Sequence, residues 1–188
     1  MIMQQWNNFE GYQECANTTK LLDVVSIDIF SKSLHEIIDN IDMFGNHSNK
    51  PLYLADGPLR ECKSIFIKEG IYQPTNSLLI DKFNATVRLL EILKNRVNFD
   101  AIITRVYVTI LPPGKIIYSH CDASGNYFST IDRYQFYFTG NKDCVQIIKD
   151  NQFSVGPGYF YFFDHRQIHE YKNNSDQDLI LMVFDLKK

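Results

Sequence analysis

Two histidines and an aspartate in the second half of the sequence have the types and spacing needed to share a metal ion. His120 and Asp122 form a His-x-Asp step at the end of the strand-like segment 115–122. Because side chains alternate along a strand, both residues are expected on the same face. His169 lies on a later strand-like segment and can complete the set. We therefore predict His120, Asp122 and His169 as metal ligands and as catalytic residues.

Two imidazoles and one carboxylate are typical of two kinds of metal centre. On an octahedral metal this set leaves open positions, which suits Fe(II) oxygenases that must hold both a cosubstrate and O2. The same ligands can also support a hydrolytic zinc ion, although the sequence has no HExxH helix. His165, four residues before His169, lies in a strand-and-turn context and is interpreted as a rim residue.

The elements that must position these residues change in kind near residue 100. Before it, apolar residues recur at helical spacing from Ser31 to Ile41, and again in a helix capped by Asp81 that runs to Val97. From Ala101 onward, short β-rich segments alternate with clusters of Gly, Pro, Asn and Asp. The prediction is an α+β, mainly β, single domain over 1–188: helix-rich at 1–100, and an antiparallel sandwich or barrel at 101–188.

The strand-like segment 101–111 has one apolar and one polar face. The apolar face carries Val106, Val108 and Ile110, and the polar face carries Arg105, Tyr107 and Thr109. The polar face can lie in water, as in a half-exposed antiparallel sheet, or it can line a cavity. Taken alone, the alternation favours the first interpretation. In the next segment Tyr118 has the same parity as His120 and is predicted to line a pocket.

Composition and charge exclude several classes of function. The 188 residues are 45% hydrophobic and 22% charged, which is ordinary for a globular protein and argues against disorder. The net charge of −3 predicts no general attraction to nucleic acid. We find neither an apolar run long enough to span a membrane nor a secretory signal, and the four cysteines form no CxxC pair. These features predict a cytoplasmic protein with reduced thiols and no membrane partner.

Several ordered pieces of residues 101–188 together resemble the aspartyl/asparaginyl β-hydroxylase family. They are Arg105 with the Leu111-Pro-Pro-Gly114 turn, His120, Arg133, and the run His169-Glu170 followed by Asn173 and Ser175. The resemblance implies a double-stranded β-helix, that is, a jelly-roll or cupin-like barrel with the N-terminal helices packed against it. It also implies a non-haem dioxygenase that uses Fe(II), the cosubstrate 2-oxoglutarate and O2, with His120 and His169 at the family's iron-ligand positions.

The sequence departs from the family at the positions that usually hold the carboxylate of 2-oxoglutarate farther from the metal. The family usually has an arginine ten residues after the second histidine, where this chain has Leu179, and often a histidine where this chain has Gln135. A carboxylate in a dry pocket needs a cationic partner. Arg133 is therefore predicted to hold the far carboxylate of 2-oxoglutarate, with Arg105, accompanied by Thr109, as the second candidate. Tyr118 is included among the predicted cosubstrate contacts.

The resemblance leaves the substrate and the catalytic state open. It implies hydroxylation of an amino acid or of an aspartyl- or asparaginyl-like residue in a peptide. Two alternatives are kept: a catalytically silent jelly-roll binding protein, which Leu179 would favour, and a metal-dependent enzyme with a different cosubstrate. The oligomeric state is not predictable from the sequence.

Overall fold

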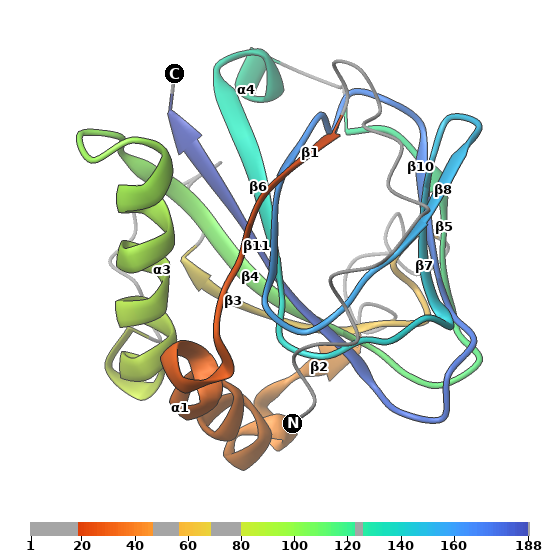
Figure 1. Ribbon diagram of the computed structural model, residues 1–188, viewed down its shortest axis with the longest axis horizontal. Coiled ribbons are helices and arrows are strands. Elements are labelled where there is room, and N and C mark those ends of the chain that lie inside the picture. Colours follow the sequence, from red (N-terminus) through yellow and green to blue (C-terminus); the bar gives the residue numbers. More distant parts are fainter. Residues whose placement is uncertain (1–18, 47–56, 69–79, 123–125, 188) are drawn as a thin grey trace.

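Two antiparallel β-sheets face each other in the part of the chain that the computed structural model describes, which comprises residues 19–46, 57–68, 80–122 and 126–187 (Figure 1). The larger sheet has seven strands in the spatial order β1 (Thr19–Val24), β9 (Tyr159–Phe163), β6 (Ile131–Tyr137), β11 (Leu179–Lys187), β4 (Ile103–Leu111), β3 (Lys63–Lys68) and β2 (Gly45–Asn46). The smaller sheet has four, in the order β5 (Ile116–His120), β10 (His169–Asn173), β7 (Cys144–Ile148) and β8 (Asn151–Ser154). This arrangement is a jelly roll, as predicted.

The N-terminal part contributes strands as well as helices to this architecture. β1 pairs with β9, and β3 pairs with β4, so the large sheet takes members from both halves of the sequence. β1 was not predicted. Its side chains alternate poorly in hydrophobicity, and its pairing partner lies far along the chain.

Two helices cover the outer face of the large sheet, on the side away from the small sheet (Figure 1). They are α1 (Ile27–Asp39) and α3 (Asn84–Val97); the one-turn α4 (Asn126–Ser129) precedes β6, and 3-10 turns occupy Ile41–Met43 and Ile80–Lys82. Both long helices were predicted, but their starts were misplaced. Ser26 occupies the N-cap position of α1, five residues before the predicted cap at Ser31. The Glu36 carboxylate of α1, not Asp81, accepts the first backbone N–H groups of α3, from Ala85 and Thr86.

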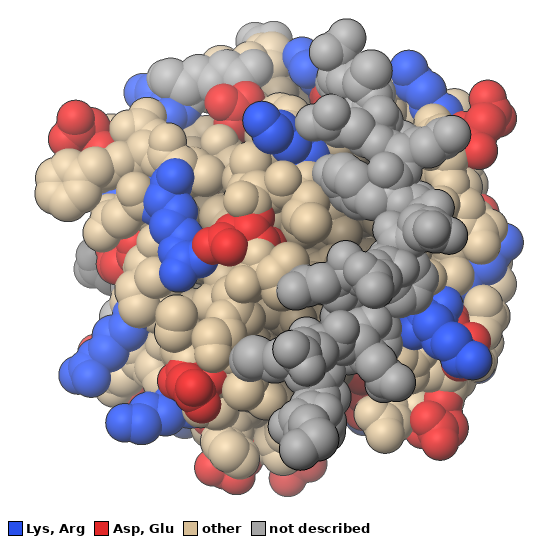
Figure 2. Space-filling model, in the orientation of Figure 1, with Lys and Arg blue, Asp and Glu red and all other residues tan. Residues whose placement is uncertain are grey.

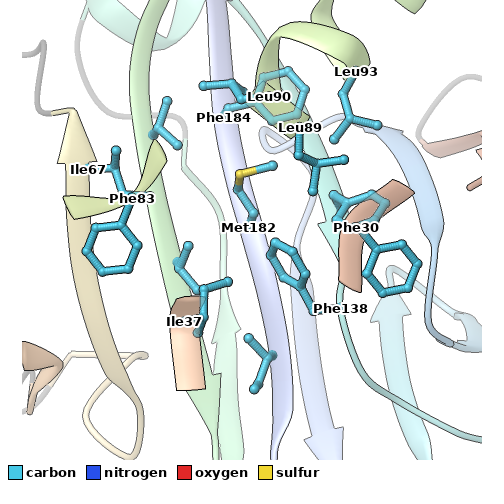
Figure 3. Packing of buried hydrophobic residues seen from close by; sticks show 14 of the residues in the cluster. Phe30, Ile37, Ile67, Phe83, Leu89, Leu90, Leu93, Phe138, Met182 and Phe184 are labelled. Carbon is cyan, nitrogen blue, oxygen red and sulfur yellow. The ribbon is translucent and has the colours of Figure 1, made fainter. Parts of the chain in front are cut away.

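The hydrophobic core lies between these helices and the large sheet. Apolar side chains from one face of the sheet interlock with those of the helices (Figure 3), and the set includes Phe30, Ile37, Leu89, Leu90, Leu93, Phe138, Met182 and Phe184. In β4 this apolar face is that of Val106, Val108 and Ile110. The polar face of β4 must therefore point the other way, toward the small sheet.

The turn between β4 and β5 is tied to the end of β10, and this sets the register of the small sheet. Gly114, with a φ of 70°, donates its N–H to the Asn173 carbonyl at 2.7 Å. The buried Asn173 side chain in turn donates to the Leu111 carbonyl at 2.8 Å. Because β5 leaves this turn alongside β10, His120 and His169 become register partners.

The described residues carry surface charges of both signs and free thiols. Basic and acidic side chains are interspersed on the face shown in Figure 2, in keeping with the small net charge of −3. Cys62, Cys121 and Cys144 are free thiols, and Cys15 lies outside the described residues. No helix within the described ranges is long and apolar enough to cross a membrane.

Candidate metal centre

His120, Asp122 and His169 meet between the two sheets. The two imidazole rings lie side by side on β5 and β10, with centroids 4.1 Å apart. Asp122 follows the end of β5, and its backbone N–H donates to the His165 carbonyl at 2.8 Å. The nitrogen Nε2 of His120 is 3.8 Å from Asp122 Oδ1, and that of His169 is 4.0 Å from Asp122 Oδ2. Three potential ligand atoms thus lie within 4.8 Å of one another.

Both imidazoles are held with the same nitrogen toward Asp122. His120 Nδ1 lies 2.6 Å from the Tyr118 carbonyl, and His169 Nδ1 lies 2.8 Å from the Gln167 carbonyl. Because a carbonyl can only accept, each Nδ1 carries a proton and donates it, which leaves the Nε2 lone pair free. Backbone-held imidazoles with a free Nε2 are the usual arrangement of metal-binding histidines.

The ionisation states of His169 and Asp122 also suit a divalent cation. Burial, together with the neighbouring His120, lowers the pKa of His169 to about 4, so its imidazole is neutral at neutral pH. Burial would raise the pKa of Asp122, but the Arg133 guanidinium and the imidazoles outweigh it and lower that pKa. Neutral imidazoles and an ionised carboxylate are the protonation states that a metal ion requires. The residues present therefore fit a bound divalent metal.

Arg133 connects this cluster to the large sheet. Its guanidinium makes a bidentate ion pair with Asp185, and its Nη1 donates to Asp122 Oδ2. Asp185 also accepts a hydrogen bond from the Tyr127 hydroxyl at 3.0 Å. Arg133 is 1% exposed and Asp185 is fully buried. The guanidinium predicted to hold the cosubstrate is thus already engaged by two carboxylates.

A cavity of about 70 Å³ adjoins the cluster and has room for several water molecules or a small ligand. Its lining includes the three ligand candidates and, from the large sheet, Arg105, Tyr107, Thr109, Arg133 and Gln135. The polar face of β4 therefore lines a cavity. The solvent-facing interpretation, which the alternation alone favoured, was wrong because the small sheet covers this face.

Arg105 is the cation in this cavity that has no carboxylate partner among the described residues. Its buried Nε has no hydrogen-bond partner there. The guanidinium carbon lies 5.1 Å from the centre of the Phe66 ring and 4.8 Å from that of Tyr107, so aromatic faces support it. Thr109, four positions from Arg105 along β4, also lines the cavity, and its hydroxyl hydrogen-bonds with Ser64 at 2.9 Å.

Tyr118 does not line the cavity, because β5 contains an extra residue opposite β10. The register partners are His120 with His169 and Ile117 with Tyr171, so three steps on β5 match two on β10. A bulge of this kind reverses the alternation. Ile117 consequently faces the cavity together with His120. The Tyr118 hydroxyl instead donates to Glu61 at 3.2 Å, and Arg60 stacks 3.5 Å from its ring centre.

The two positions at which the chain departs from the family have different surroundings. Leu179 is fully buried in an apolar cluster with Leu111 and does not line the cavity. Gln135 lines the cavity and hydrogen-bonds with Tyr171.

Sequence reasoning missed four residues around the site, and it misplaced His165 as well as Tyr118. Asp185, Gln146, Tyr171 and Tyr127 carry no motif, and only the pairing of their strands or turns brings them to the site. Burial raises the pKa of Tyr171, so its phenol is protonated at neutral pH. His165 is buried, not at the rim: its ring packs against Phe128, and its Nε2 lies 3.2 Å from the Phe128 carbonyl.

Comparisons with known proteins agree with this fold. The sequence model of the family described as Aspartyl/Asparaginyl beta-hydroxylase matches residues 68–188. No curated protein matches the sequence. Among solved structures, a prolyl hydroxylase from Trichoplax adhaerens, in complex with a hypoxia inducible factor oxygen degradation domain peptide fragment, is 13% identical with a TM-score of 0.57, over 92% of this chain and 84% of that one.

Two further solved structures share the fold at similarly low identity. A prolyl-4-hydroxylase from Pseudomonas putida is 12% identical, with a TM-score of 0.54 over 91% of both chains. An oxidoreductase of the 2OG-Fe(II) oxygenase family from Burkholderia pseudomallei is also 12% identical, with a TM-score of 0.53 over 67% of this chain and 66% of that one. At such identities the likeness extends to the fold alone.

Proposed function

Because the chain belongs to the aspartyl/asparaginyl β-hydroxylase family, we propose that it is an Fe(II)- and 2-oxoglutarate-dependent oxygenase acting on an aspartyl- or asparaginyl-like substrate. The observation that carries the proposal is the convergence of His120, Asp122 and His169 beside a cavity. Iron bound there would supply the oxidising power. In the overall reaction one atom of O2 enters a substrate C–H bond, the other enters succinate, and 2-oxoglutarate loses CO2.

The three side chains have distinct roles in this proposal. His120 and His169 present the lone pairs of their Nε2 atoms to the metal, and the hydrogen bonds of their Nδ1 atoms to backbone carbonyls fix this orientation. Asp122 supplies one negative charge. Two neutral ligands and one carboxylate leave a divalent ion with a net charge near +1, which favours an anionic cosubstrate. Arg133 holds one oxygen of Asp122 and thereby restricts the orientation of the carboxylate.

The far carboxylate of 2-oxoglutarate requires a cation, and we assign this role to Arg105. Leu179 cannot supply a charge, and the guanidinium of Arg133 is taken up by Asp185 and Asp122. Arg105 lines the cavity and makes no ion pair with a described residue. Thr109 lies on the same face of β4 and offers a hydroxyl group to the same ligand.

The substrate class rests on the family and on one structural neighbour. The prolyl hydroxylase that shares the fold was solved in complex with a peptide fragment, which supports a peptide as one candidate substrate. We therefore propose a peptidyl aspartate or asparagine, or the corresponding free amino acid, as substrate.

The test is turnover of 2-oxoglutarate by the purified protein. With Fe(II), O2 and 2-oxoglutarate supplied, succinate should form slowly in the absence of a substrate to be oxidised and faster in its presence. A library of aspartyl and asparaginyl peptides should contain members that gain one oxygen atom. His169→Ala should form no succinate. If the wild-type protein binds iron yet never produces succinate, the proposal fails and the silent binding protein becomes the better account.

A further inference from the structure

One turn of the chain supplies backbone acceptors for two of the three candidate metal ligands. It comprises residues 164–168, between the end of β9 and the start of β10. The His165 carbonyl accepts the backbone N–H of Asp122 at 2.8 Å. The Gln167 carbonyl accepts the Nδ1–H of His169, also at 2.8 Å. The conformation of this turn therefore fixes both the position of Asp122 and the orientation of the His169 ring.

Asp164 closes the turn through its backbone and its side chain. Its carbonyl accepts the N–H of Gln167 at 3.1 Å. Its Oδ1 accepts the backbone N–H of Arg166 at 3.3 Å and the Nε–H of the same residue at 2.8 Å. Its Oδ2 accepts the side-chain amide of Gln167 at 3.3 Å. An aspartate that caps the N–H two residues further on stabilises a turn that its backbone alone would hold more loosely.

The Asp164 carboxylate is buried and ionised. The residue is 5% exposed, whereas the side chain of Arg166 is 51% exposed. Burial raises the pKa of Asp164, but the hydrogen bonds from Arg166 and Gln167 outweigh burial and lower that pKa below its usual value. Asp164 neither lines the cavity nor belongs to the cluster of candidate ligands, so it can act on the site only through the turn.

The third candidate ligand is held by a different segment. His120 Nδ1 donates to the Tyr118 carbonyl at 2.6 Å, within its own strand β5. A change in the turn should therefore disturb Asp122 and His169 and leave the ring of His120 in place. This contrast separates a local positioning role from a general loss of stability.

The turn stays attached to its surroundings without the Asp164 carboxylate. The Ile168 carbonyl accepts the N–H of Lys149 at 2.9 Å, which joins the turn to the loop between β7 and β8. The ring of His165 packs against Phe128 of α4. Loss of the carboxylate should therefore shift the peptide groups of the turn without unfolding the sheet beneath it.

We propose that Asp164 is a positioning residue: by closing the turn 164–168, its carboxylate orients the His169 imidazole and places Asp122 for metal binding. The inference rests on the part of the proposed function that assigns a divalent metal to this site. It adds a residue that touches neither the metal ligands nor the cavity.

The first measurement uses the metal-free protein and nuclear magnetic resonance, at a pH above the ordinary pKa of histidine. The nitrogen chemical shifts of each imidazole report which ring nitrogen carries the proton. In the wild type, His120 and His169 should both be protonated on Nδ1. In Asp164→Ala, His169 should gain the tautomer protonated on Nε2 while His120 keeps the proton on Nδ1. The amide hydrogen of Asp122 should exchange roughly 10-fold faster.

The second measurement is Mn(II) affinity by calorimetry. Asp164→Ala should weaken Mn(II) binding about 10-fold or more. Asp164→Asn keeps one oxygen for the Arg166 N–H groups and should weaken it only about 3-fold. Asn141→Ala is the matched control, because Asn141 Oδ1 accepts the Asp143 N–H at 2.8 Å in a similar turn. That turn lies at the other end of β7 from the residue paired with His169, so this variant should bind Mn(II) normally.

The outcomes separate this inference from the proposed function. Asp164→Ala with the wild-type His169 tautomer and Mn(II) affinity would overturn the inference, even if its melting temperature falls, and so would equal disturbance of His120 and His169. Should Asp164→Ala not fold, an Asp164→Asn variant identical to the wild type in both measurements would overturn it. If the wild type binds Mn(II) but never forms succinate from 2-oxoglutarate, the proposed function fails and the inference still stands or falls on these variants. If the wild type binds no divalent metal, both fail.

Discussion

Arg133 and Asp185 form a bidentate ion pair across β6 and β11, with Nε–Oδ1 and Nη2–Oδ2 distances of 2.7 and 2.8 Å. The remaining nitrogen of the guanidinium donates to Asp122. One buried side chain thus links a candidate metal ligand to the central strands of the large sheet. This relationship makes Arg133 a part of the scaffold that holds the site, and it leaves Arg105 as the available cation in the cavity.

Loss of Arg133 should therefore be a stability defect first. Arg133→Ala leaves the buried Asp185 and the half-buried Asp122 without their cation, which costs roughly 3–5 kcal/mol of unfolding free energy. Arg105→Ala removes a partly exposed cation whose described contacts are with the aromatic rings of Phe66 and Tyr107, and should cost about 1 kcal/mol or less. Urea unfolding of both variants measures the difference. Equal losses would contradict the distinction between the two arginines.

Arg105 should instead govern cosubstrate affinity. Arg105→Ala removes the cationic partner of a carboxylate and should raise the dissociation constant of 2-oxoglutarate about 10- to 100-fold, with little effect on metal affinity. Arg105→Lys should retain only part of the affinity for 2-oxoglutarate, because an ammonium group does not reproduce the bidentate contact of a guanidinium. Calorimetric titration of the metal-loaded variants provides the measurement, and unchanged affinity in Arg105→Ala would locate the anchor elsewhere.

Metal affinity should depend on His120 and His169 and not on histidines elsewhere in the chain. His120→Ala and His169→Ala should each abolish tight Fe(II) or Mn(II) binding while keeping the circular dichroism spectrum of the wild type, since the apolar core lies on the other face of the large sheet. Asp122→Ala should weaken binding. The exposed His35 on α1 gives a matched control, because His35→Ala should bind metal normally. Full affinity in His169→Ala would remove the assignment.

The stability of the metal-free protein should fall on mild acidification. The pKa of His169 is about 4 in the folded chain and 6.5 in its ordinary state, so between these values the unfolded chain binds a proton that the folded chain does not. Stability from this group is complete above pH 6.5 and is lost as the pH falls to about 4. The loss amounts to about 3 kcal/mol. Unfolding free energies measured in a chelator across this range should show a smaller slope for His169→Ala than for the wild type.

The sequence was sufficient for the features that depend on local pattern. Strand segments, the two long helices and the mainly β fold follow from apolar periodicity, and the His-x-Asp step with a later histidine singled out the three residues that the structure brings together. The prediction for His120 and Asp122 needed only that both side chains lie on the same face near the end of one strand.

The remaining features depend on pairing between distant strands. A bulge in β5 opposite β10 determines which way Tyr118 points, and no local sequence pattern predicts this bulge. The partner of Arg133 was decided by the register of β6 with β11, which places Asp185 opposite it. Whether the polar face of β4 met water or a cavity depended on the small sheet that covers it. None of these contacts is encoded within a single segment.

The most direct test of the central claim is the visible absorption of the protein loaded with Fe(II) under anaerobic conditions, before and after 2-oxoglutarate is added. Chelation of the metal by the 2-oxo acid should produce a charge-transfer band that is present in the wild type, weakened in Arg105→Ala at limiting cosubstrate, and missing in His169→Ala. A protein that binds Fe(II) tightly but develops no band at saturating 2-oxoglutarate would contradict the account.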